Sequence, residues 1–356
     1  MGTESLPVCS HNEWDTVEEV IVGTALGACI PEWHVTLKAT LPERYWSFFK
    51  EHGGQPFPDE IVRAAERDLD GLAKILEAEG VRVRRPEPMR QARGFASPHW
   101  RSRGGLYAAM PRDCLLVVGD EILEVPMAWR CRHFETQAFR PLLKEYFLRG
   151  AKWTAAPKPM LGDALYDEGF HESAKNGVAS VLTEIEPVFD AADFLRCGKD
   201  IVYFRSHTTN ALGVEWLSRH LGSAYRFHEL ECDDTHRMHI DTTFLPLRPG
   251  LLMVNPERVR TIPRLFRSWD ILEAPPGCTP DDVPLYFSSK WLNMNVFMLD
   301  EERVLVAAHE KPLIAALRNR GLAPIPVPFL SFYPLGGSIH CATLDVVRRG
   351  ALKSYF

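Results

Sequence analysis

Length, composition and charge narrow the possible functions before any motif is considered. The chain has 356 residues with 41 Lys and Arg against 47 Asp and Glu, and its formal net charge of −6 gives no electrostatic reason to expect nucleic-acid binding. A hydrophobic content of 46% with 25% charged residues is typical of a soluble globular protein, and no apolar run is as long as a membrane span.

The cysteines and the first residues also restrict the protein class. The eight cysteines are scattered, without a CxxC pair, which argues against a disulfide framework and a zinc site; most are expected to be small buried residues. Residues 1–14 lack the basic and apolar parts of a secretory signal, which predicts a cytoplasmic protein. Pro, Gly and acidic residues interrupt the Arg-rich stretch 82–103, which we interpret as a solvated loop.

The predicted elements begin with an amphipathic helix over 58–80, where apolar residues recur at helical spacing and Gly80 is a stop signal. Several later segments share a hairpin pattern. A polar residue opens an apolar run, Gly, Pro or Asp residues make a tight turn, and a second apolar run returns. These predicted hairpins are 111–127, 189–204, 239–255 and 288–307, and 336–349 begins in the same way.

Helices and short strands fit between the hairpins. Segments 210–222 and 312–321 have helical patterns that end at a glycine. A short strand follows each helix, over 81–86, 225–230 and 323–329. The repeating unit is therefore hairpin, helix, strand, and no linker separates the units. The sequence predicts one α/β domain over 1–356, with about five ββαβ units arranged radially around an axis.

Each predicted unit carries a polar residue at its opening. Equivalent strand ends converge on the axis of a closed ring, so we expect these residues to meet although they are far apart in sequence. A carboxylate, an imidazole and a thiol at equivalent positions favour a catalytic centre over five unrelated buried polar groups. The five residues are Asp113, Asp190, His239, Ser288 and Cys341, and the last four recur at about fifty residues.

Cys341 is the candidate nucleophile. It follows Gly336-Gly337, which leaves space for a substrate, and a thiol beside an imidazole is the arrangement of nucleophilic catalysis. The adjacent His340 is expected to face the other side of a strand, so His239 is the preferred partner. His239 and Asp241 are expected to share one face of a strand.

The remaining polar residues suggest a substrate. Asp113 and Asp241 cannot activate a thiol, but carboxylates can clamp a planar guanidinium through paired hydrogen bonds. Arg258 and the hydroxyls of Ser288 and Ser289 can hold a carboxylate. Together these groups match a molecule with a guanidinium at one end and a carboxylate at the other, which is arginine.

Eight longer motifs cover nearly the whole chain and resemble the amidinotransferase family, which includes arginine:glycine amidinotransferase and bacterial enzymes that amidinate antibiotic or toxin precursors. The motifs are HNEWDTVEEVIVG (11–23), MPRD (110–113), PMAWRCRHFE (126–135), GAKWTAAPKP (150–159), EPVFDAADFLRCGKDI (186–201), MHIDTTF (238–244), SSKWLNMNV (288–296) and GGSIHCATLDVVRRGALKSY (336–355).

The resemblance implies a fold and a set of site residues. The implied fold is a five-bladed, pentein-like α/β propeller of ββαβ units. The implied reaction needs no metal or organic cofactor. Residues before the catalytic histidine vary with the substrates accepted, and the glycine enzyme has a small polar residue where His236 stands, which argues against glycine as the acceptor. The implied roles are a catalytic triad of Asp190, His239 and Cys341, guanidinium binding by Asp113 and Asp241, carboxylate binding by Arg258, Ser289 and Ser288, and substrate contacts by Met238 and His236.

The implied reaction is a ping-pong transfer. The Cys341 thiolate takes the amidino group of arginine, ornithine leaves with a proton from His239, and an amine then accepts the group. The acceptor stays open among glycine, lysine, a short ω-amino acid and an aminocyclitol. A hydrolase that makes citrulline and a non-catalytic arginine-binding protein are the alternatives. A homodimer and a role in secondary-metabolite or toxin biosynthesis follow from the resemblance alone, and the polar segment 163–184 is a predicted lid.

Overall fold

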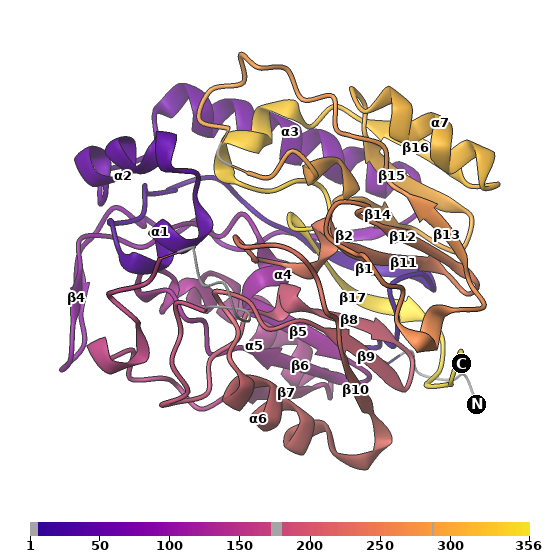
Figure 1. Ribbon diagram of the computed structural model, residues 1–356, viewed down its shortest axis with the longest axis horizontal. Coiled ribbons are helices and arrows are strands. Elements are labelled where there is room, and N and C mark those ends of the chain that lie inside the picture. Colours follow the sequence, from indigo (N-terminus) through magenta and orange to yellow (C-terminus); the bar gives the residue numbers. More distant parts are fainter. Residues whose placement is uncertain (1–5, 172–179, 287) are drawn as a thin grey trace.

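The computed structural model describes residues 6–171, 180–286 and 288–356, and within them the strands form five three-stranded sheets and one two-stranded ladder (Figure 1). In each three-stranded sheet the central strand has one antiparallel and one parallel neighbour. Within each sheet, neighbouring strands follow one another in these orders: β17 (Thr343–Arg349), β1 (Thr16–Val22), β2 (Arg82–Arg84); β5 (Leu115–Val118), β6 (Glu121–Glu124), β7 (Lys152–Ala155); β8 (Phe194–Cys197), β9 (Asp200–Tyr203), β10 (Arg226–Glu229); β11 (Phe244–Arg248), β12 (Leu251–Val254), β13 (Asp270–Glu273); and β14 (Phe297–Met298), β15 (Arg303–Ala307), β16 (Ala323–Val327). The ladder joins β3 (Phe95–Ala96) to β4 (Arg101–Ser102).

Glycines with positive φ make three of the predicted hairpin turns. Gly119, Gly198 and Gly250 have φ values of 62°, 68° and 82°, a backbone that only glycine adopts without steric cost. The strand pairs β5–β6, β8–β9 and β11–β12 flank these turns, and β14–β15 forms the fourth predicted hairpin. All four hairpins are therefore confirmed.

Crossover helices carry the chain from a central strand to its parallel neighbour in four of the five sheets of the described chain. They are α3 (Asp59–Ala78), α5 (Arg140–Leu148), α6 (Ala211–Leu221) and α7 (Lys311–Asn319). In Figure 1, α3 and α7 lie along the top and α6 along the bottom. The remaining crossover differs from the predicted repeat, because its one helical element is the 3₁₀ turn Arg264–Phe266. Pro256 and Pro263 interrupt that segment and prevent a continuous helix.

Three of the five polar opening residues, Asp113, Asp190 and His239, lie in or directly before short helical turns rather than on strands. His239 directly precedes the 3₁₀ turn Ile240–Thr242, and β11 begins only at Phe244. The expectation that His239 and Asp241 share one face of a strand is therefore wrong, because the period of two applies only to extended backbone. Similar turns occur at α4 (Pro111–Cys114) and at Ala191–Asp193.

The sheet that contains β17 is closed by a strand from the other end of the described chain. Residues 336–349 were expected to begin a hairpin, but β17 pairs antiparallel with β1, from Thr16 opposite Arg349 to Val22 opposite Thr343. The registry shifts on both sides of Glu19, which marks a β-bulge. Cys341, just before β17, is therefore positioned by contacts between distant segments.

A buried group of charged side chains connects β17 and β8 with α4 and the segment before β1, and we name it the central ion cluster. Its members are Glu13, Arg112, Arg196, Asp345 and Arg348, each buried. Asp345 of β17 accepts hydrogen bonds from Arg112 at 2.7 Å and from Arg196 of β8 at 2.8 Å. Arg348 adds a third bond to the same carboxylate at 2.7 Å. Such a cluster is stable only while every charge keeps its partner.

Apolar side chains fill the space between the outer helices and the sheets. Leu69, Leu72 and Leu76, which lie on one face of α3, are fully buried, as their helical spacing predicted. Two further helices, α1 (Val35–Thr40) and α2 (Trp46–His52), lie in the segment before α3. Every helix within the described ranges is too short or too polar to cross a membrane.

Candidate active site

A cavity of about 220 Å³ contains nearly all of the residues that the sequence marked for chemistry. Asp190 does not line the cavity, but its carboxylate contacts the His239 side chain. The segments that directly precede β5, β8, β11, β14 and β17 bring most of these residues together, although they are far apart in sequence. The lining residues from the predicted set are Asp113, His236, Met238, His239, Asp241, Arg258, Ser288, Ser289 and Cys341.

The backbone of His239 has an unusual conformation for a residue with a side chain, since its φ is +60°. Its N–H donates to Asp193 Oδ1 at 3.0 Å. The other oxygen of Asp193 accepts hydrogen bonds from Ser206, Thr208 and Thr209. Asp193 therefore holds the strained backbone that aims the imidazole, a role that its place in the FDAAD motif did not reveal.

The imidazole of His239 lies between two buried carboxylates. Its Nε2 is 3.1 Å from Asp190 Oδ2, and its Nδ1 is 3.6 Å from Asp113 Oδ1. Burial lowers the pKa of His239, but Asp113, the hydrogen bond with Asp190 and the interaction with Cys341 outweigh burial and raise the pKa well above its usual value. The imidazolium form is therefore favoured in the free protein.

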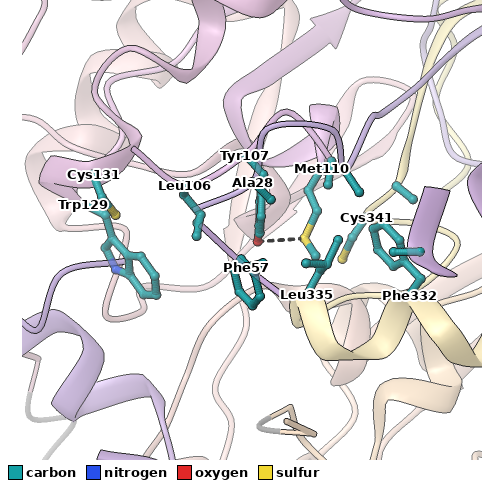
Figure 2. Packing of buried hydrophobic residues seen from close by; sticks show 14 of the residues in the cluster. Ala28, Phe57, Leu106, Tyr107, Met110, Trp129, Cys131, Phe332, Leu335 and Cys341 are labelled. Atoms are coloured by element: carbon teal, nitrogen blue, oxygen red, sulfur yellow. Dashed lines mark hydrogen bonds between the residues drawn. The ribbon is translucent and has the colours of Figure 1, made fainter. Parts of the chain in front are cut away.

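Close packing around Cys341 explains the glycine before it. A Cβ atom on Gly337 would lie 2.5 Å from Met110 Cε and 3.1 Å from the Cys341 Cβ. Figure 2 shows Met110 beside Cys341, and the dashed line marks the 3.3 Å hydrogen bond that Tyr107 donates to the Met110 sulfur. Gly336 has a φ of +90°. The two glycines thus permit a tight turn and a side chain packed against Cys341.

Polar groups surround the sulfur of Cys341. Its Sγ is 3.0 Å from Asn295 Nδ2 and 3.6 Å from Asp241 Oδ2. Burial, followed by the charge of Asp241, raises the pKa of Cys341 to about 12, and His239 opposes this shift. His340 contacts Asp241 at 2.8 Å through Nδ1. In the free protein, Cys341 is therefore a thiol rather than a thiolate.

Asp113 and Asp241 each have one bonded and one unbonded oxygen. Oδ2 of Asp113 accepts from Arg132 at 2.9 Å, and Oδ2 of Asp241 accepts from Asn295 at 2.7 Å. Oδ1 of each residue is buried and accepts no hydrogen bond from the residues that the structure describes. Unbonded buried acceptors are costly, so a ligand with several N–H donors fits between them.

Arg132 connects the cavity carboxylates to the protein behind them. It is almost completely buried and forms paired hydrogen bonds with Glu135 at 2.7 and 2.6 Å. The nitrogen that binds Asp113 also lies 3.8 Å from Asp190 Oδ2. Arg132 thus orients both carboxylates. The PMAWRCRHFE motif contained it, but no spacing rule distinguished it from the neighbouring arginine.

Arg258 and Ser289 lie together in the cavity wall, as the sequence suggested. Arg258 donates to Ser289 Oγ at 3.0 Å and to the hydroxyls of Thr242 and Thr243 at 3.1 and 3.2 Å. Its Nε is 3.1 Å from Asp234, which the sequence reading missed. These partners fix a cation with adjacent hydroxyl donors, the kind of site that binds a carboxylate.

Much of the remaining cavity wall is apolar and had no signal in the sequence. It comes from the segment containing α1 and α2 and from residues near Met110. Its residues include Pro31, Leu37, Leu41, Phe49, Phe57 and Leu106. The predicted lid, 163–184, includes 172–179, which lie outside the described residues. In its described part, Tyr166 pairs with Leu182 in an isolated bridge, and none of these residues lines the cavity.

The same site contains a group of atoms that could hold a metal ion. One ligand atom each from Asp113, His239 and Cys341 lie within 4.8 Å of one another. Linear spacing in the sequence did not indicate this set, because the three residues come from different sheets. The set is also that of an acid, a base and a thiol arranged for proton transfer and nucleophilic attack.

Comparisons with known proteins agree with this arrangement. No protein-family model matches the chain. The chain is 52% identical to an L-arginine:L-lysine amidinotransferase of Pseudomonas savastanoi pv. phaseolicola, over 99% of this chain and 97% of that protein. It is 48% identical to the mitochondrial glycine amidinotransferase of Danio rerio, over 99% of this chain and 86% of that protein.

Solved structures give the same result. An amidinotransferase of Microseira wollei from the saxitoxin biosynthetic pathway has a TM-score of 0.94 and 50% identity, covering 98% of this chain and 100% of that chain. The inosamine-phosphate amidinotransferase of Streptomyces griseus has a TM-score of 0.87 and 38% identity, covering 98% and 99%. A dimethylarginine dimethylaminohydrolase, 14% identical with a TM-score of 0.58 over 92% of this chain and 99% of that chain, shares the α/β fold alone. The extent of these matches shows that the chain belongs to the amidinotransferase family.

Proposed function

We propose that the protein takes the amidino group of L-arginine onto Cys341 and transfers it to a primary amine. One observation carries the proposal: the cavity places a buried thiol beside Asp113 and Asp241, each with an oxygen unbonded by any described residue. A guanidinium between these carboxylates supplies N–H donors to both. Its central carbon then lies beside the sulfur, while Arg258 and Ser289 bind the substrate carboxylate.

In the first half-reaction, the sulfur of Cys341 forms a bond to the central guanidinium carbon and the bond to the ornithine nitrogen breaks. The thiol proton is released to solvent as the guanidinium binds, and His239, already an imidazolium, gives its proton to the departing nitrogen, so the positive charge stays on the amidino group. Asp190, bonded to Nε2 of His239, holds the ring and stabilises its charged form during this transfer.

The carboxylates also suggest why the thiol reacts only with a bound cation. Asp241 adds to burial in raising the pKa of Cys341, and Asp113 raises that of His239. A guanidinium between them neutralises both charges, which lowers both pKa values. The lower pKa of Cys341 favours the thiolate when substrate is in place, and the lower pKa of His239 makes its imidazolium a better proton donor to the departing nitrogen.

In the second half-reaction, the acceptor amine attacks the amidino carbon and gives one proton to His239. The bond between carbon and sulfur breaks, and the sulfur keeps the electron pair and regains a proton from solvent. The products are the amidinated amine and the free thiol. The scheme requires that the acceptor enter the space that ornithine leaves.

We propose an α-amino acid with a terminal amine, such as lysine, as the acceptor class. Its carboxylate can use Arg258 and Ser289 as arginine does, which places the distant amine at the sulfur. The 52% identity to an arginine:lysine amidinotransferase supports the same choice. Another biosynthetic amine would need contacts from the acceptor side, where His236 and Met238 line the cavity.

We propose further that the five three-stranded sheets are the blades of one five-bladed propeller, built by a single catalytic domain that works as a homodimer. The repeated pattern of an antiparallel and a parallel neighbour supports the blades. Four of the five opening residues line one cavity and the fifth, Asp190, contacts His239, which supports a common axis. Sedimentation of the purified protein tests the dimer, and a monomer at working concentration would count against it.

The reaction is tested by incubating purified protein with arginine, alone and with glycine, lysine, a short ω-amino acid and an aminocyclitol. Ornithine, citrulline and each amidinated amine are measured by mass spectrometry. We expect ornithine to appear in proportion to amidinated lysine. Citrulline formation independent of any amine would establish a hydrolase instead.

A Cys341→Ala variant separates catalysis from binding. We expect it to bind arginine and release no ornithine, because the covalent step is lost. With arginine alone, the unaltered protein should gain the mass of one amidino group on the peptide that contains Cys341. Ornithine release by the variant would show that another residue is the nucleophile.

A further inference from the structure

Asn295 is buried beside Cys341, and every hydrogen-bonding group of its side chain is engaged there. Its Oδ1 accepts the backbone N–H of Cys341 at 3.1 Å. Its Nδ2 lies 2.7 Å from Asp241 Oδ2 and 3.0 Å from the Cys341 sulfur. Its backbone carbonyl accepts the N–H of His340 at 3.3 Å. The residue therefore links the nucleophile, the preceding backbone and one carboxylate of the guanidinium site.

The hydrogen-bond pattern determines which end of the amide faces the sulfur. In the opposite orientation, the amide oxygen would face the Asp241 carboxylate and the NH₂ group would face the N–H of Cys341. Two acceptors would then face each other at Asp241, and two donors would face each other at the N–H of Cys341. In the observed orientation, the two N–H groups of Asn295 have two acceptors, the carboxylate and the sulfur. Asn295 is therefore a donor to Cys341.

A donor to the sulfur matters most when the sulfur is negatively charged. In the reaction proposed above, this charge develops as the sulfur attacks arginine and again as it leaves the amidino carbon. Asp241, 3.6 Å away, opposes it on both occasions. The amide of Asn295 is neutral and fixed, so it needs no proton transfer to remain a donor in both half-reactions.

We propose that Asn295 is a further catalytic residue, which donates an N–H to the Cys341 sulfur in both half-reactions and holds Asp241 with the same amide. The proposal rests on the function proposed above. The SSKWLNMNV motif contains this residue, but only its two serines were predicted to belong to the site. Its contact with the sulfur of a distant segment was not readable from the sequence.

Two substitutions separate donation from positioning. Asn295→Asp keeps an oxygen for the backbone N–H of Cys341 but removes the donors to the sulfur, while Asn295→Leu removes all three bonds at similar size. Asn293→Leu is the matched control, because Asn293 is buried in the 3₁₀ turn Leu292–Met294 directly before Asn295 and bonds to Pro275 rather than to the site. Circular dichroism establishes that each variant is folded.

The main measurement is the pH dependence of iodoacetamide alkylation at Cys341, followed on its peptide by mass spectrometry without substrate. We expect both Asn295 variants to alkylate about tenfold more slowly at each pH below the thiol pKa, and the Asn293 variant to match the unaltered protein. In single-turnover experiments, formation and discharge of the amidino-cysteine should both slow by about tenfold or more.

An unchanged alkylation profile together with slow turnover would reduce Asn295 to a structural support and overturn the proposal. Unchanged half-reactions in Asn295→Leu would overturn it as well. Failure of the unaltered protein to form an amidino-cysteine would instead contradict the proposed function, while the alkylation profile, which needs no substrate, would still decide whether Asn295 donates to the sulfur.

Discussion

The surroundings of Cys341 keep its proton in place in the free protein. Burial raises the pKa of Cys341 to about 12, and Asp241 adds to the shift. Below that value the thiolate fraction rises tenfold per pH unit, so we expect alkylation at Cys341 to rise by about tenfold per unit from about pH 7 to 9. A rate that levels off within this range would mean that the free enzyme already holds a thiolate.

Asp241 should affect reactivity and catalysis in opposite directions. Asp241→Asn removes the charge that raises the pKa of Cys341, so we expect alkylation at neutral pH to become about tenfold faster. The same change removes one side of the proposed guanidinium site, so amidino transfer should fall by more than about a hundredfold. Asp113→Asn is the comparison: it should impair transfer similarly but raise alkylation less, because Asp113 is the weaker influence on the thiol. Slower alkylation in Asp241→Asn would refute this electrostatic explanation.

At the scale of elements, the turn before β17 has no space for an added atom unless the Met110 side chain moves. Gly337→Ala places a Cβ 2.5 Å from Met110 Cε, and we expect it to lower the free energy of unfolding by about 1–3 kcal/mol and to reduce turnover. Gly71→Ala in α3 is the matched control, because its Cβ meets nothing within 4 Å and should stabilise the helix by about 0.5–1 kcal/mol. Urea unfolding measures both, and equal effects would contradict the packing explanation.

The elements also show where sequence reasoning succeeds. The hairpins and the crossover helices α3, α6 and α7 were predictable because their signals are local: Gly119 and Gly198 permit the turns, and Asn210 caps α6 by accepting the N–H of Gly213. The crossover helix α5 was not predicted. The turn that follows His239 was not predictable, because residues 240–242 have no strong local preference and depend on contacts such as that of Asp193 with the His239 backbone.

For the whole molecule, the central ion cluster should be a main support of the fold. Burial tends to raise the pKa of Asp345, but Arg196, Arg348 and Arg112 hold it well below its usual value. Asp345→Asn leaves these buried guanidinium groups without their shared anion, and we expect a loss of about 3–5 kcal/mol in the free energy of unfolding. Asp163→Asn, which breaks an exposed ion pair, should change it little.

The pH dependence of this loss has a definite sign. Because the pKa of Asp345 is lower in the folded protein than in the unfolded chain, its stabilisation is fully present above the unfolded value, about 3.9, and is lost as pH falls toward the folded value. The difference between the unaltered protein and Asp345→Asn, measured by urea unfolding, should therefore narrow below about pH 4. A gap that widens in acid would contradict this assignment.

Long-range contacts set the limit of prediction at this scale. The repeat indicated that opening residues would meet, and Asp113, His239 and Cys341 do lie together. The supports of the site were not predictable, because Arg132 and Asn295 are distinguished only by partners from other segments. The pairing of β1 with β17 joins segments separated by most of the chain, a contact for which a single sequence carries no local signal.

That pairing has a consequence for the order of biosynthesis. Cys341 stands two residues before β17, and β17 is completed only when almost all of the described chain has left the ribosome. Until then β1 lacks its antiparallel partner, and the nascent protein exposes an unpaired strand edge to chaperones and to other chains. A translation product that ends early lacks the reactive sulfur altogether. Catalytic competence should therefore arise in a single late step. Chains that end before Cys341 should have no partial activity.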